Sequence, residues 1–142
     1  MTRALPLLLL LFLPMARGWG ADPAQEVWEL LTQAASALSE RNAAVFLEAF
    51  APAMPGYQKL REDVTALLRN AEVQSAIELE SDDGNAQSRT LELNWLLRIR
   101  PEPEATASAR REQRVKCRVE KTGNKWRIVF FEPLTLFAAP GA

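Results

Sequence analysis

The spacing of apolar residues changes once along this chain, near residue 72, and this change constrains the fold more than any other feature. Before residue 72 apolar side chains recur every three or four positions, and after it they alternate. The first spacing is typical of amphipathic helices and the second of strands with one buried face. The chain is therefore expected to form an α+β domain, with its helices gathered on one face of a curved antiparallel sheet.

Three helices are predicted before the change. The first begins at Asp22 and Pro23, because aspartate can cap the free amides of a first turn and proline fits the first helical position. It continues to about residue 40. A shorter helix over residues 42–50 and a third over residues 57–70 follow, each with apolar residues on one face.

Four strands are predicted after the change, over about residues 72–80, 91–100, 111–121 and 125–132. Asp82–Asn85 and Gly123-Asn124 are turn signals between them. Pro133 ends the pairing, and a fifth short strand over 134–137 is left open.

In the last strand Trp126, Ile128 and Phe130 alternate with Arg127, Val129 and Phe131. Both faces of its end are apolar, so both are expected to be covered.

The first 20 residues are typical of an export signal. Arg3 precedes a continuous apolar run over residues 4–13, and the small residues Ala16, Gly18 and Gly20 follow. The run is shorter than the roughly 20 residues that span a bilayer. We expect cleavage after Gly18 or Gly20, and residues 21–142 to form a single domain in the periplasm or outside the cell. The alternative is an uncleaved membrane anchor.

Composition excludes several kinds of chemistry. The chain has no histidine and one cysteine, Cys117, so a Ser-His or Cys-His catalytic pair is excluded, and neither a metal site nor a cofactor is predicted. Cys117 lies in an alternating strand, so we expect it to be buried; the alternative is pairing with another molecule. With 17 basic and 18 acidic residues, no nucleic-acid partner is expected.

The chain resembles the nuclear-transport-factor-two-like superfamily, which includes ketosteroid isomerase and SnoaL-like domains with a cystatin-like α+β cone. The resemblance lies in the long first helix, the short helix Asn42–Phe50 followed by Ala51-Pro52, and the closing strand Lys125–Phe131 after a Gly-Asn turn. It implies a cone-shaped domain, often with a small apolar ligand at its mouth. Many members have a strand between the second and third helices, and residues 53–56 are too short for one.

Four aromatic residues are candidates for an apolar ligand pocket, namely Trp28, Tyr57, Trp95 and Trp126. Apolar pockets with a few polar groups are common ligand sites. The simpler interpretation is that these side chains fill the core.

The isomerase chemistry that the resemblance allows needs a carboxylate base facing the cavity. Strand alternation instead places the carboxylates on the outward face of the sheet: Glu78, Glu80, Glu92 and Glu120. No catalytic residue is therefore predicted. Glu48, on the short helix, could approach the mouth, although a solvated surface glutamate is the simpler interpretation.

The outward face of the sheet is a candidate partner surface. Its basic residues include Arg98, Arg114, Lys116 and Arg118. Such a face is either solvated and internally paired, or it docks an acidic protein, a second copy or anionic headgroups.

These observations predict a non-catalytic exported domain that binds a partner protein, including a second copy of itself, or a small apolar ligand. The alternative is a small-molecule isomerase or cyclase of the SnoaL-like kind. A membrane contact is expected only through an uncleaved signal.

Overall fold

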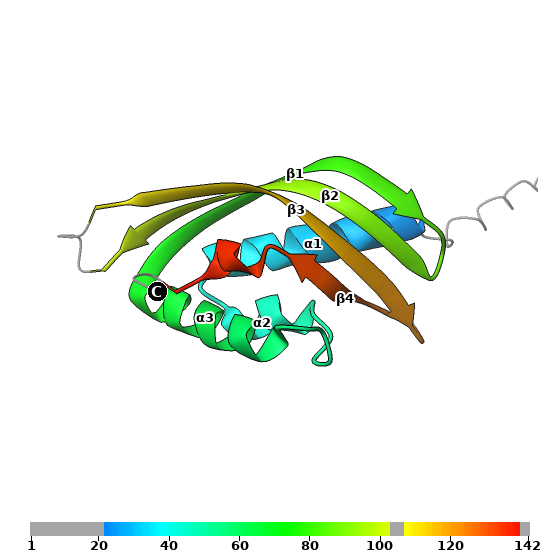
Figure 1. Cartoon of the computed structure of the whole chain (residues 1–142), viewed down its shortest axis with the longest axis horizontal. Helices are drawn as coiled ribbons and strands as arrows, with labels where there is room; N and C mark the ends of the chain where they lie inside the picture. Colours follow the sequence, from blue (N-terminus) through cyan, green and yellow to red (C-terminus); the bar gives the residue numbers. More distant parts are fainter. Residues whose placement is uncertain (1–21, 103–106, 140–142) are drawn as a thin grey trace, which may run out of the picture.

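The computed structural model describes residues 22–102 and 107–139, so the predicted signal segment and part of the loop after Pro101 lie outside the described residues. The antiparallel sheet has the strand order β1-β2-β3-β4, and it bends over the helices (Figure 1). The predicted α+β class and strand count are confirmed. The elements are α1 (Pro23–Ser39), α2 (Ala43–Glu48), α3 (Tyr57–Asn70), β1 (Ala71–Gly84), β2 (Ser88–Pro101), β3 (Ala109–Thr122), β4 (Lys125–Glu132) and the 3-10 helix η2 (Leu134–Phe137).

Side chains that accept hydrogen bonds from first-turn amides start the first two helices. Asp22 Oδ1 accepts from the Ala24 amide at 3.3 Å, and Asn42 Oδ1 accepts from the Val45 amide at 3.1 Å. Both contacts satisfy amides that have no partner within the helix. Within the described parts of the chain, no helix is long and apolar enough to cross a membrane.

The core lies between α1 and the concave side of the sheet. Buried residues of α1, among them Val27, Leu31 and Leu38, share one cluster with the inward residues of β2. β2 alternates strictly between buried and more exposed positions from Leu91 to Ile99, as the sequence predicts. Burial of this one face is what holds the helices against the sheet.

The position that was left open for a fifth strand, residues 134–137, is the 3-10 helix η2. The guanidinium of Arg111, on β3, donates from one nitrogen to the carbonyl oxygens of Leu136 and Ala138, both at 2.8 Å. Leu136 and Phe137 are buried beneath it. The C-terminal segment therefore covers the end of the core and adds no strand.

The expectation that both faces of the end of the last strand are covered is wrong for Phe130. The β3–β4 register shifts between Arg118 and Val119. Phe130 is 38% exposed, whereas Phe131 is 4% exposed. An extra residue on one strand reverses the facing of every side chain beyond it. Phe130 therefore lies on the outward face of the sheet, and Phe131 lies in the core.

The free edge of β4 is partly covered by the segment after α2. Phe50 and Ile128 form an isolated parallel bridge, in which the Ala51 amide donates to the Ile128 carbonyl at 2.8 Å and the Ile128 amide donates to Ala49 at 2.7 Å. As the sequence predicts, no strand lies between α2 and α3; this single bridge occupies the place.

Candidate functional site

The structure does not gather the four candidate aromatic residues around one cavity. Trp95 is 0% exposed and belongs to the core. Trp28 and Tyr57 are half-buried and pack against that core. Trp126, which is 7% exposed, lines a surface groove that includes none of the other three.

Aromatic rings fill the space between helices and sheet. The Trp95 ring contacts Phe131 and Phe137, with centroids 5.8 and 5.3 Å apart, and Phe46 and Phe50 extend the cluster. The indole nitrogen of Trp95 donates to Ser75 Oγ at 2.8 Å. No polar or charged side chain is buried among the described residues. The interior is thus a packed aromatic core around Trp95.

Cys117 is buried in the same core. Burial, with a smaller contribution from the negative charge of Asp82, raises the pKa of its thiol to about 12. The thiol stays protonated near neutral pH, and a protonated thiol is a poor nucleophile. The position agrees with the buried location predicted from strand alternation.

The candidate partner surface on the outward face carries charges of both signs. Arg114 lies 3.6 Å from Glu80 and 3.4 Å from Glu92, and Arg118 lies 3.5 Å from Glu120. These exposed pairs partly neutralise the basic residues and contribute little to stability.

Two other residues of that predicted surface lie at different places on the same face. Arg98 is directly opposite Arg110 in the β2–β3 register, and two like charges in this position repel one another. Lys116 is opposite Glu92 on β2 and Glu132 on β4. The face is therefore a mixed-charge surface with a basic concentration along β3.

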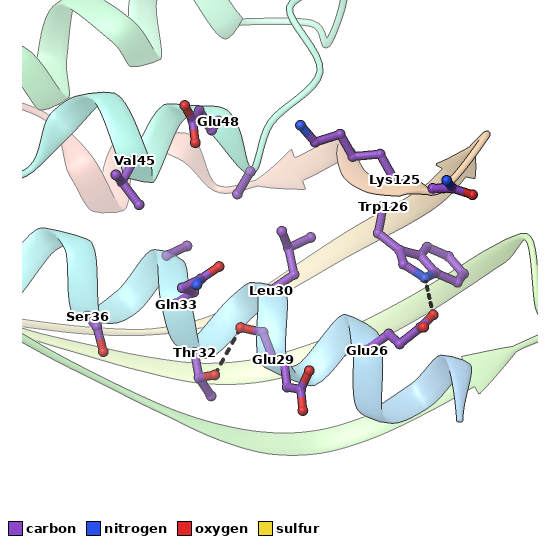
Figure 2. Close-up of a pocket in the computed structure, with 13 residues that line it drawn as sticks. Glu26, Glu29, Leu30, Thr32, Gln33, Ser36, Val45, Glu48, Lys125 and Trp126 are labelled. Atoms are coloured by element: carbon purple, nitrogen blue, oxygen red, sulfur yellow. Dashed lines mark hydrogen bonds between the residues drawn. The ribbon is translucent and has the colours of Figure 1, made fainter. Parts of the chain in front are cut away.

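A groove of about 710 Å³ runs between α1, α2 and the start of β4. Figure 2 shows Leu30 pointing from α1, and Val45 pointing from α2, into the space between the two helices. Val45 is 37% exposed. Ala34 and Ala49 also line the groove. The groove therefore offers an apolar floor to an outside molecule.

Glu26 and Trp126 line one end of the groove (Figure 2). The Trp126 indole donates to Glu26 Oε1 at 3.0 Å. The ammonium of Lys121 lies 3.6 Å from the same oxygen and 5.9 Å from the centre of the Trp126 ring. Glu26 thus links α1 to the β3–β4 hairpin.

Sequence reasoning missed the groove as a site. Leu30 recurs at helical spacing with Val27 and Leu31, which favours a buried position, but it is only partly buried. Val45 lies beside the face that Phe46 and Leu47 bury, and this apolar residue is the one signal in the sequence. Single apolar residues are common on protein surfaces. Val45 therefore indicates a groove only once the position of α1 opposite it is known.

Residues 22–102 and 107–139 contain no group of three or more acidic, cysteine or histidine side chains arranged to hold a metal ion.

No protein-family model matches the chain, and no curated protein matches its sequence. Solved structures do match. A conserved protein from Planctomyces limnophilus superposes with a TM-score of 0.70 at 8% identity, over 78% of this chain and 94% of that one. A nuclear transport factor 2-like superfamily protein from Salmonella enterica has a TM-score of 0.63 at 14% identity, over 77% and 87% of the two chains.

The chain has the nuclear-transport-factor-two-like fold. A third match with this fold is a proposed scytalone dehydratase from Novosphingobium aromaticivorans, with a TM-score of 0.65 at 10% identity over 76% of this chain and 80% of that one. At such identities the similarity establishes the nuclear-transport-factor-two-like fold and leaves the activity open.

Proposed function

We propose that this protein is an exported, non-catalytic domain that binds a protein partner in the groove between α1 and α2. The observation that carries the proposal is the apolar floor of that groove, into which Leu30 points from α1 and Val45 points from α2 at different positions along it. Concave apolar surfaces with polar rims are typical of binding sites.

The packed interior supports a site on the surface over a small apolar ligand inside the cone. Trp95, Phe131 and Phe137 occupy the space that such a ligand would need. A ligand could enter only if these rings moved, and closely packed cores resist such a change.

Export is the second part of the proposal, and it is supported by the sequence of residues 1–20. Mass spectrometry of the protein recovered from outside the cytoplasm is expected to show a chain that lacks the first 18 or 20 residues. A full-length mass in that fraction would contradict cleavage.

Site-specific photo-cross-linking in the producing cells tests the binding function. A photoreactive residue at Val45 reports on the groove, one at Lys116 reports on the outward sheet face, and one at Arg61, exposed on α3, serves as the matched control. We expect one specific protein adduct from position 45 and none from position 61. Adducts from position 116 alone would move the site to the sheet face, and no adduct from either position would overturn the binding function.

A second candidate is a small-molecule lyase, isomerase or cyclase. It is supported by the name of one structural neighbour, a proposed scytalone dehydratase, and by the carboxylates of Glu29 and Glu48 at the groove. Native mass spectrometry of protein purified from its own cells separates the two candidates. A retained small molecule that is lost from a Glu29→Gln, Glu48→Gln variant would favour the enzyme.

A further inference from the structure

We infer that the groove between α1 and α2 accepts an amphipathic helix whose apolar stripe is flanked by lysine or arginine. The inference rests on the proposed function, because it names the class of partner for the same site. Three properties of the groove lead to it: its apolar floor, the sign of its charge and the helical character of its walls.

The floor requires apolar side chains from the partner. Leu30 on α1 and Val45 on α2 both point into the space between the helices, at different positions along the groove (Figure 2), and Ala34 and Ala49 also line it. Burial of such carbon surface stabilises a complex by roughly 25 cal/mol per Å² before the costs of association. A purely polar segment would leave this floor exposed to water.

The rim requires positive charge. The lining residues of the groove include three glutamates and one lysine, Lys125. Glu26 is already bonded to Trp126 and lies close to Lys121. Glu29 on α1 and Glu48 on α2 are exposed, and neither forms an ion pair with another residue of the described ranges. A cationic side chain of the partner is attracted to either carboxylate, and this attraction also raises the rate of association. An anionic side chain is repelled.

The walls favour a helical partner over an extended one. On both sides of the apolar floor the wall is a helix, and the backbone groups of a helix bond within it. An extended segment would find few backbone partners there, and its own buried amides and carbonyls would stay unpaired. A helix brings its backbone bonds with it. The groove follows α1 from Glu26 to Ser36, about 15 Å and three turns along a helix axis.

Fluorescence anisotropy with synthetic peptides tests the inference on the purified domain. The probe is a leucine–lysine peptide of about 12 residues, three helical turns, with its leucines on one face. One control peptide carries glutamate in place of every lysine, and another has the same composition in an order that spreads leucine around the helix. We expect only the probe to bind, and more weakly as salt is added.

Matched variants then place the probe on the molecule. Glu29→Lys with Glu48→Lys is expected to weaken binding about tenfold, because two attractions become repulsions. Glu62→Lys with Glu78→Lys makes the same charge change on exposed positions of α3 and β1, and it is expected to leave binding within about twofold once charge screening is matched. A melting curve checks that each variant folds.

The outcomes separate this inference from the proposed function. Equal weakening by both variant pairs would show non-specific attraction to charge and overturn the inference. Equal or tighter binding of the acidic or the scrambled peptide would show that the inferred class of partner is wrong. The proposed function would still stand in that case, because the groove would still bind a peptide. Failure of every peptide to bind would also overturn the inference, and cross-linking from position 45 would still decide the proposed function.

Discussion

At the residue scale, burial is the main cause of the chemistry of Cys117. The residue lies opposite Leu91 on β2 and Phe131 on β4, and its side chain is 0% exposed. Removing a thiolate from water is costly, so the protonated form is favoured. The sole cysteine is therefore a packing residue.

We predict that Cys117 resists alkylation in the folded protein and makes stability depend on alkaline pH. Its folded pKa of about 12 lies above the ordinary value of 9.0, so between those pH values the folded state holds a proton that the unfolded state loses. The contribution is complete below pH 9 and is lost toward pH 12, by at most about 1.4 kcal/mol per pH unit. Chemical denaturation of the wild type and Cys117→Ala across this range measures it; parallel pH curves would contradict it.

At the element scale, the sequence predicts well those structures that depend on local signals. The caps at Asp22 and Asn42 and the apolar stripes locate all three helices. Turn signals were less decisive, because β1 continues to Gly84 through residues expected in the turn, in register with β2 as far as Arg89. Asp82 also forms an ion pair with Arg89 across the hairpin, at 2.9 Å. The reversal at Phe130 arises from a register shift against β3, and neither strand alone specifies it.

Arg41 connects three elements, and we predict that its side chain stabilises the C-terminus of α3. Its Nε donates to the Leu68 carbonyl at 3.0 Å and an Nη donates to the Arg69 carbonyl at 3.3 Å. Its φ of 60° is a left-handed conformation that asparagine tolerates. Arg41→Asn should therefore lower the free energy of unfolding by about 1–2 kcal/mol without added strain, and it should speed hydrogen exchange in the last turn of α3.

Glu102→Gln is the matched control for Arg41. It removes only an ion pair whose side chains are 36% and 48% exposed, so it should cost less than about 1 kcal/mol. Equal losses in the two variants would show that the carbonyl contacts contribute nothing.

At the scale of the whole molecule, the fold follows from the sequence and the site does not. One change of apolar spacing is enough to predict helices packed over a curved sheet, because the apolar faces of both must be buried against each other. The groove depends instead on how α1, α2 and the start of β4 meet, and residues such as Leu30 and Lys125 come together only there. The aromatic residues that sequence reasoning proposed for a pocket are the ones that the core uses, as Trp95 shows.

We predict that a chain beginning at Ala21 folds as one cooperative unit. The buried hydrophobic residues of the described chain form one cluster between Val27 and Phe137, and we expect that cluster to suffice for folding. A domain of this size should unfold near its midpoint with an enthalpy of about 80 kcal/mol, and its calorimetric and van't Hoff enthalpies should agree. Near-ultraviolet circular dichroism should show an immobilised Trp95 in the folded state. A broad transition without that signal would mean that the domain boundary is wrong and that residues before Ala21 complete the core.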